Sequence, residues 1–209
     1  LEKVTFEKNG VISAIEDYAF ADCSALKSFT LPNTVEKLGM GALATCASLT
    51  EVSLGTGLKA IPSYFLDNSA ALEEVSIPYQ VTAIASSAFA RSPKLKKVTI
   101  PANVTSIASD IFSYPGEVTI YGVEGSYAQT YANENGISFV AQTVPATDIS
   151  IETEQMELNI GATKVITHNV LPVDFTDTLI WSSSDEKVAT VEAGKVKGVK
   201  SGTVTITIK

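Results

Sequence analysis

Residues with the chemistry for catalysis are few in this sequence, and their spacing matches no catalytic pattern. His168 is the only histidine, and no G-x-S-x-G segment presents a nucleophilic serine to it. Glu73 and Glu74 are adjacent carboxylates in or beside one short predicted strand. A carboxyl group that acts as a general acid needs a raised pKa, and nothing in the sequence around these two residues predicts the burial that would raise it. We therefore predict no catalytic residue, an exposed or hydrogen-bonded His168, and a protein that is not an enzyme.

Metal-ligating side chains are equally sparse. The segment Ser182–Glu186 carries oxygen atoms for a calcium ion but lacks the spacing of a calcium-binding loop. Cys23 and Cys46 are the only cysteines, and two thiolates without histidine or carboxylate partners do not complete a zinc site. Glycine-rich phosphate-binding loops are absent. We expect no metal site and no cofactor.

The two cysteines point to the organisation of the chain. They lie 23 residues apart, and the same position continues as Ser69 and Ser92. If successive units stack about 4.8 Å apart, a disulfide is geometrically possible. The serines favour a different interpretation, in which the position needs a small, half-buried side chain and both thiols are free and buried.

A period of 23 residues governs roughly the first two thirds of the chain. Leu26, Leu49, Leu72 and Leu95 begin successive copies, and the copy from Leu72 reads L-x-x-V-x-I-P, then V-x-x-I, then A-F. A fixed period of this length indicates a solenoid, whose coils bury their apolar sides against one another. No segment of a copy is long enough for a full helix, so each coil is expected to hold short parallel strands and one 3₁₀ or α turn.

Five apolar columns are predicted to line the interior. The three strand columns hold Leu1, Leu26, Leu49, Leu72, Leu95; Val4, Phe29, Val52, Val75, Val98; and Phe6, Leu31, Leu54, Ile77, Ile100. The two columns of the opposite wall hold Ile12, Val35, Leu58, Val81, Val104 and Ile15, Leu38, Ile61, Ile84, Ile107. Prolines that directly follow the strand end it, because proline lacks the N–H that a ladder needs.

A small-plus-large pair in each turn is expected to plug its coil. The pairs are Ala19-Phe20, Ala42-Leu43, Phe65-Leu66, Ala88-Phe89 and Ile111-Phe112. Bulk stands at the small position in Phe65 and Ile111, so we expect local distortion there. Asn9-Gly10 is a tight-turn pair within an insertion in the first copy, which predicts a small protrusion.

The pattern changes after Phe112, as the end of a solenoid requires. Val118–Ile120 is predicted as a last repeat strand. Ser126 is a candidate N-cap for a short helix that ends before Gly136, and the residues from 137 to 140 form a candidate closing strand. Tyr127 and Tyr131, four residues apart, are expected to pack in the core.

Residues 1–141 resemble the BspA-like leucine-rich repeats, a 23-residue class found on bacterial cell-surface and secreted proteins. The resemblance rests on L-x-x-V-x-I-P, V-x-x-I, A-F-x-x-C/S and the ending G-S-Y-A-x-x-Y-A-x-E-N-G-I-x-F. It implies a leucine-rich repeat solenoid that binds proteins, including adhesion to host extracellular matrix proteins.

The period is lost after a short polar connector at residues 142–147. Residues 148–209 show short alternating runs separated by turn signals, which predict a β-sandwich. The runs are Ile149–Ile151, Met156–Leu158, Thr163–Thr167, Leu179–Trp181, Val188–Val191, Val196–Val199 and Val204–Ile208. The predicted fold class is therefore mainly β with short 3₁₀ or α turns, in two domains.

The second domain resembles the group 2 bacterial Ig-like domain. The residues that carry the resemblance are W-S-S-S-D-E-K-V-A-T-V at Trp181–Val191 and G-K-V-K-G-V-K-S-G-T-V-T-I at Gly194–Ile206. It implies an Ig-like β-sandwich with Trp181 in its core. Members usually continue through another strand, so we expect a sandwich that lacks its last edge strand.

The net charge of the chain argues against nucleic acid and membrane surfaces as partners, and its hydropathy argues against a membrane span. Acidic residues outnumber basic ones 23 to 15, for a net charge of −8, which disfavours nucleic acid and anionic membrane surfaces. No run of apolar residues is long enough to span a membrane. Because Leu1 begins a repeat without a leader sequence, we expect the chain to be part of a longer protein. We also expect a monomer, secreted or at the bacterial cell surface.

The candidate binding site is the outward side of the repeat strands, where leucine-rich repeats commonly dock partners on a concave face. One outward column holds Lys3, Ser28, Glu51, Glu74 and Lys97, and the other holds Thr5, Thr30, Ser53, Ser76 and Thr99. The columns lack aromatic residues, which disfavours sugar stacking. The sequence thus favours a non-catalytic adhesion or protein-binding fragment with the Ig-like domain as spacer. One alternative is that the serine and threonine residues only keep an exposed strand soluble and bind no partner. The others are a structural scaffold and a carbohydrate-binding accessory module of a larger surface enzyme.

Overall fold

The chain forms two compact units, Leu1–Gln142 and Thr143–Lys209. The computed structural model describes residues 1–7, 11–113, 117–152, 155–172 and 175–209. The expected Asn9-Gly10 turn lies outside the described residues. The regular structure of each unit consists of short strands joined by turns and loops, and the first unit also carries one helix, α1 (Tyr127–Glu134).

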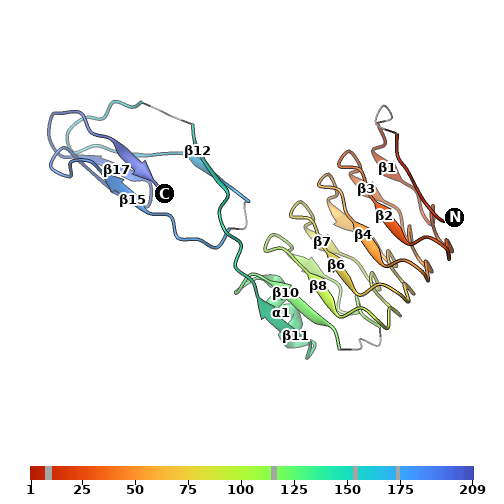
Figure 1. Ribbon diagram of the computed structural model, residues 1–209. Coiled ribbons are helices and arrows are strands. Elements are labelled where there is room, and N and C mark those ends of the chain that lie inside the picture. The colour runs from red at the N-terminus through yellow and green to blue at the C-terminus, as the bar shows by residue number, and fades with distance from the viewer. Residues whose placement is uncertain (8–10, 114–116, 153–154, 173–174) are drawn as a thin grey trace. The chain divides into compact units, whose positions relative to one another are not determined.

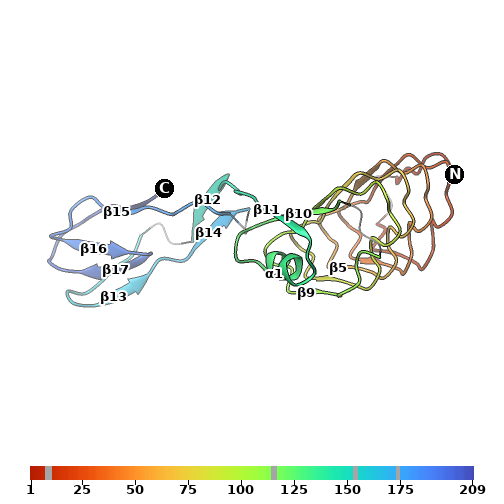
Figure 2. The ribbon, with the colours of Figure 1, turned by 90° about the horizontal axis from the view of Figure 1, so that it is seen from below.

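The first unit is a solenoid of stacked coils (Figures 1 and 2). One side of the stack carries β2 (Ser28–Thr30), β4 (Glu51–Ser53), β6 (Glu74–Ser76), β8 (Lys97–Thr99), β10 (Thr119–Gly122) and β11 (Ser138–Ala141). A second row carries β1 (Ala14–Ile15), β3 (Lys37–Leu38), β5 (Ala60–Ile61), β7 (Ala83–Ile84) and β9 (Ser106–Ile107). Every strand pair in these rows is parallel, and repeat strands pair in the 23-residue register.

The predicted apolar columns form the interior of the stack. Leu26, Leu49 and Leu72 are fully buried, and Leu95 is 1% exposed. Burying one leucine side chain contributes about 2 kcal/mol, and each is covered only by its own coil and the adjacent ones. The first copy departs most from this pattern, because Leu1 is 62% exposed and because Val4 and Phe6, which pack against the core, are only partly buried. The leucine-rich repeat solenoid is therefore confirmed.

The turns repeat a backbone feature that the sequence analysis missed. Two columns of residues, four apart in each copy, adopt left-handed backbone with φ between 52° and 60°: Tyr18, Gly41, Tyr64, Ser87 and Asp22, Thr45, Asn68, Arg91. Successive turns are hydrogen-bonded, as from the Leu66 amide to the Ala88 carbonyl (2.8 Å) and from the Phe89 amide to the Ile111 carbonyl (3.0 Å). The turn of the third copy keeps both left-handed residues and its hydrogen bonds at Phe65, so the distortion expected there is wrong. In the fifth copy Asp110 is not left-handed and residues 111–113 form a bend, so the turn at Ile111 departs from the pattern of the other copies.

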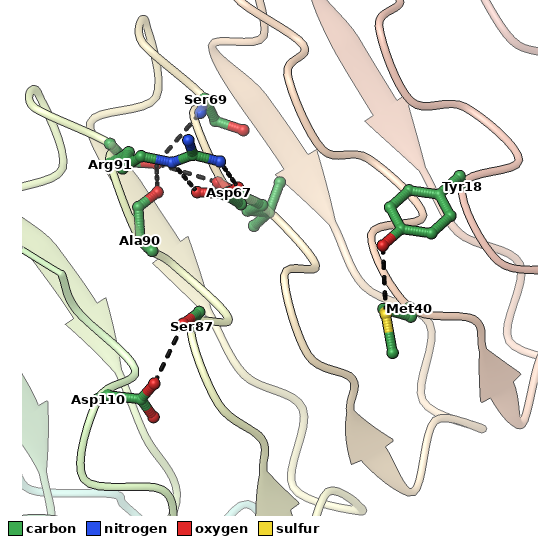
Figure 3. Close-up of polar contacts among 10 residues, drawn as sticks. Tyr18, Met40, Asp67, Ser69, Ser87, Ala90, Arg91 and Asp110 are labelled. Carbon is green, nitrogen blue, oxygen red and sulfur yellow. Dashed lines mark hydrogen bonds and ion pairs between the residues drawn. The ribbon is translucent and has the colours of Figure 1, made fainter.

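Side chains join neighbouring turns as well (Figure 3). Arg91 pairs with the buried carboxylate of Asp67 through two N–H groups. The hydroxyl of Ser87 donates to Asp110 (3.1 Å), and the hydroxyl of Tyr18 donates to the sulfur of Met40 (3.3 Å). These contacts join the first turn to the second and link the third, fourth and fifth turns in series.

The small-residue column of cysteines and serines contributes a further series of hydrogen bonds. Cys46 Sγ donates to the Phe20 carbonyl (3.2 Å), and Ser92 Oγ donates to the equivalent Leu66 carbonyl (3.0 Å). Both cysteines are free thiols; Cys46 is fully buried and Cys23 is half-buried. A buried thiol therefore substitutes for a serine in this column.

Strand pairing is interrupted on both sides of the third copy. In the second row the break falls between β3 and β5. Gly39 and Ala85 each donate their amide to the preceding coil, whereas the equivalent residue Pro62 has no N–H to donate. In the first row the break falls between β4 and β6. There the column sets Glu51 beside Glu74, and like charges directly opposite one another destabilise pairing.

The cap closes the C-terminal end of the stack. Ser126 caps α1, its hydroxyl accepting from the Gln129 amide, and Gly136 follows the helix with φ 66°. β11 pairs in parallel with β10. Tyr131 is buried as expected, but Tyr127 is 44% exposed, so the prediction that both tyrosines pack in the core is wrong for Tyr127.

The second unit is a β-sandwich of seven described strands: β12 (Asp148–Ile151), β13 (Thr163–Val165), β14 (His168–Leu171), β15 (Trp181–Ser183), β16 (Ala189–Glu192), β17 (Lys195–Gly198) and β18 (Ile206–Ile208). All its pairs are antiparallel. Met156–Leu158 is not a strand, and His168–Leu171 is one that the sequence analysis missed. A small core forms around Ile166, Ala189 and Val196.

The residues of the connector bond to the unit on each side. The Gln142 amide donates to the Gly122 carbonyl in the solenoid cap (2.7 Å). The Val144 amide donates to Thr176 Oγ1 (2.8 Å) and the Ala146 amide to Asp177 Oδ2 (2.7 Å), both in the sandwich. The linker boundaries at residues 142–147 stay a prediction.

The left-handed turns predict a stabilising substitution. Thr45 has φ 60°, and a β-branched residue is strained there, whereas asparagine tolerates it and occupies the same column at Asn68. We expect Thr45→Asn to raise the free energy of unfolding by about 1 kcal/mol. Circular dichroism in urea would measure it. The control Thr105→Asn, at an exposed threonine outside the left-handed columns, should bring no gain; equal gains from both would contradict the explanation.

The buried thiol predicts a loss of stability in alkaline solution. Burial raises the pKa of Cys46 from 9.0 to about 11, so above pH 9 the unfolded chain releases a proton that the folded chain keeps. The stabilisation is complete below pH 9 and falls by about 1 kcal/mol by pH 10. Burial also raises the pKa of Tyr131, to about 12, which extends the decline upward.

Urea titrations at pH 8, 9 and 10 under reducing conditions would measure this loss. All seven tyrosines precede the connector and the single tryptophan follows it, so tyrosine and tryptophan fluorescence report on separate units. Cys46→Ser should remove most of the decline between pH 9 and 10, leaving the smaller part that Tyr131 contributes. The tryptophan signal should not share the decline. A variant that declines as steeply as the native chain would refute the assignment.

Candidate functional site

The structure places most of the predicted binding residues on one continuous surface. Ser28, Glu51, Glu74 and Lys97 form one column across β2, β4, β6 and β8, and Thr30, Ser53, Ser76 and Thr99 form the second. All are exposed except Lys97 and Thr99, which are half-buried. We call these eight side chains the strand face. Lys3 and Thr5 are exposed but belong to no strand, so the structure does not bring them into the sheet.

The same surface continues into the cap, which the sequence analysis missed. Thr119 of β10 and Ser138 of β11 extend the first column, and Tyr121 and Val140 extend the second. Tyr121 is half-buried and Val140 is 42% exposed. The alternation of outward and inward residues in the predicted cap strands could have indicated these four residues. Only the parallel register of β8, β10 and β11 shows that they align with the columns of the repeats. The sheet therefore includes an aromatic residue, contrary to the expectation from the repeats alone.

A hollow of about 310 Å³ lies on the strand face where β4 and β6 are unpaired. It is lined by Thr50, Glu51, Val52, Glu74, Val75, Ser76, Lys97 and Thr99. Val52 is only half-buried, unlike Val75 and Val98 in the same core column. Five predicted binding residues thus border one depression.

Of the three charged side chains around this hollow, Lys97 and Glu74 form an ion pair and Glu51 is not part of it. Lys97 Nζ lies 3.5 Å from Glu74 Oε2 and 5.3 Å from the centre of the Tyr121 ring. Lys97 of β8 thus contacts side chains of both neighbouring strands, β6 and β10. Glu51 has no ion pair within the part of the chain that the structure describes. An exposed ion pair contributes less than about 1 kcal/mol to stability, so these charges are available for recognition.

A second hollow, of about 500 Å³, lies in the β-sandwich. It is lined by His168, Leu179, Trp181, Val191, Glu192 and Ala193. The rings of His168 and Trp181 meet edge to face with centres 5.2 Å apart, and His168 Nδ1 lies 3.3 Å from the Ile166 carbonyl. Trp181 packs against the small core but remains half-buried. The indole ring of Trp181 therefore packs against the core and also borders the hollow.

Three of the side chains considered for calcium form hydrogen bonds within the sandwich. Ser183 Oγ donates to the Ala189 carbonyl (2.6 Å), Ser184 Oγ accepts from the Thr205 amide (2.9 Å), and Asp185 accepts from the Lys187 amide (2.9 Å). Across the described residues, no three histidine, cysteine or acidic side chains gather as metal ligands. Within the same ranges, no helix is long and apolar enough to cross a bilayer.

Comparison with protein families matches both units. The model of the BspA type leucine rich repeat region matches residues 1–118 in six copies, and that of the bacterial Ig-like domain (group 2) matches residues 145–208. The chain belongs to the BspA type leucine-rich repeat family and carries a group 2 bacterial Ig-like domain. Both families are typical of bacterial surface or secreted proteins, and their folds are typically non-catalytic.

Two curated proteins match short segments of the chain. A 3-O-alpha-D-galactosyl-alpha-L-arabinofuranosidase of Bifidobacterium longum subsp. longum is 56% identical over 52 residues, which cover 24% of this chain and 5% of that protein. The minor capsid protein of Enterobacteria phage T3 is 43% identical over 63 residues, 29% of this chain and 14% of that protein. The chain therefore spans only a small part of either relative.

Solved structures with the same fold come from bacterial repeat proteins. A leucine rich cell surface protein of Faecalibacterium prausnitzii A2-165 is 28% identical with a TM-score of 0.55, covering 64% of this chain and 34% of that one. A leucine-rich repeat protein of Bacteroides ovatus ATCC 8483 is 25% identical with a TM-score of 0.51 (57% and 31% covered). The pneumococcal vaccine antigen PcpA shares the fold at 21% identity and a TM-score of 0.50 (64% and 42%).

Proposed function

We propose that this chain is the binding part of a bacterial surface or secreted adhesion protein, with the strand face as its protein-binding site. The observation that carries the proposal is the hollow at β4, β6 and β8, which the exposed side chains of Glu51, Glu74 and Ser76 border. The cell-surface protein of similar sequence and fold supports the location.

The geometry of the solenoid favours a protein ligand. The coils present side chains at regular intervals of about 4.8 Å over several strands, with hydroxyl groups that both donate and accept hydrogen bonds. Tyr121 is the one aromatic residue on the described part of this sheet's outer side, and Lys97 lies over its ring. A sugar-stacking platform needs an open aromatic face. Extracellular matrix proteins are the ligands that we propose, and the Ig-like unit serves as a spacer.

A paired substitution tests the binding face. Ser53→Lys/Ser76→Lys places two long cations on adjacent strands of the strand face, where both serines are exposed. We expect at least a tenfold loss of binding to any member of a panel of purified extracellular matrix proteins that the native chain binds, measured by biolayer interferometry. The melting temperature should change little, because exposed substitutions usually alter stability by less than about 0.5 kcal/mol.

The matched control carries the same charge change on the other side of the coils. Thr82→Lys/Thr105→Lys alters two exposed threonines of adjacent copies beside β7 and β9, and it should bind like the native chain. Equal losses in both variants would point to charge alone. Unchanged binding in the Ser53/Ser76 variant would place the site elsewhere.

A second candidate function is that of a structural module in a larger enzyme. The match to the B. longum glycosidase favours it, because the shared segment is 5% of that protein. In that case the native chain binds no member of the matrix panel at micromolar concentration. Binding to a glycan array would instead support a carbohydrate-binding accessory module.

A further inference from the structure

The strand face changes its chemistry from β4 toward the cap. At β4 the exposed carboxylate of Glu51 lies at the hollow without a cation in the described part of the structure. At β8, Lys97 already neutralises Glu74. At the cap, Tyr121 of β10 and Val140 of β11 stand opposite each other in register and offer a partly exposed apolar surface. The face therefore has one unpaired negative charge and, some distance away, one apolar patch.

The spacing of these two features fits an extended polypeptide that crosses the strands. Glu51 and Tyr121 are separated by three strand steps, β4 to β6 to β8 to β10, or about 14 Å across the strands. They are also two residues apart along the strands, about 7 Å, so their positions lie about 16 Å apart. An extended chain advances about 3.3 Å per residue, so four residues span about 13 Å, and a long lysine or arginine side chain reaches the remaining distance of about 3 Å. Side chains four positions apart in an extended chain point to the same side. One segment can thus direct both side chains at the strand face.

We propose that the strand face binds an extended segment with a lysine or arginine at Glu51 and an apolar or aromatic residue four positions away against Tyr121 and Val140. This inference rests on the proposed function and names the kind of partner segment. The hollow receives the cationic side chain, whose charge complements Glu51. The hydroxyl groups of Ser76 and Thr99, between the two ends, face the backbone of the segment and can hydrogen-bond to it.

Labelled nonapeptides of glycine and serine, each with one lysine and one phenylalanine two, four or six positions apart, test the spacing against the full chain by fluorescence anisotropy. We expect the four-residue spacing to bind about fivefold more tightly than the other two. It should show a similar advantage over the same peptide with glutamate in place of lysine. Equal affinities for all spacings, or no binding by any peptide, would overturn the inference.

Two variants assign the ends of the segment. Glu51→Gln should abolish the preference for lysine over uncharged norleucine and keep the preference for phenylalanine over serine. Val140→Thr should weaken the phenylalanine preference and keep that for lysine. Both side chains are exposed, so the melting temperature should not change. Glu36→Gln, an exposed glutamate beside β3 on the other row, is the matched control and should keep both preferences.

The outcomes separate this inference from the proposed function. Preferences that Glu51→Gln and Val140→Thr leave intact would overturn the inference. If Ser53→Lys/Ser76→Lys still blocks a matrix protein in that case, the strand face remains the binding site and only the basic-to-apolar motif is wrong. If the peptides show the expected pattern but no matrix protein binds, the inference holds and the proposed class of ligand fails.

Discussion

The stacking of apolar columns between successive coils is the constraint on which the repeat unit depends. A single coil of 23 residues cannot enclose its own leucines, so the coils must lie in register, and Leu26, Leu49, Leu72 and Leu95 do so with almost no exposure. That register fixes every other column. It aligns the hydroxyl and charged residues of β2, β4, β6 and β8 into one surface and the left-handed residues into a ladder of turns.

The third copy shows how such an array accommodates residues that do not suit it. Pro62 removes one amide from the second strand row, and Glu51 beside Glu74 opposes pairing in the first, yet the core column continues through Leu49 and Leu72. Apolar contacts and the unbroken turn ladder hold the coils together across both interruptions. The loosened strands leave the hollow that borders the candidate binding residues, so a local defect in pairing and a candidate site coincide.

The two units combine a rigid array with a smaller sandwich, an arrangement consistent with the surface and secreted families that they match. Hydrogen bonds within the turns and burial within the cores account for the local structure. In the solenoid the candidate binding residues are side chains that the fold leaves outside its core. For that reason the core sequence identifies the family, whereas the outward residues would identify the partner.

The sequence alone determined the solenoid, its five apolar columns, the helix cap at Ser126 and the sandwich class, because periodic burial and turn chemistry act over short distances. It did not determine the left-handed residues at Thr45 or Arg91, since many residue types adopt that backbone when neighbouring turns bond to it. Nor did it reveal the hollow or the place of Tyr121 and Val140 beside Lys97. Those depend on which strands pair and in what register, and contacts between residues far apart in the chain exist only once the coils have stacked.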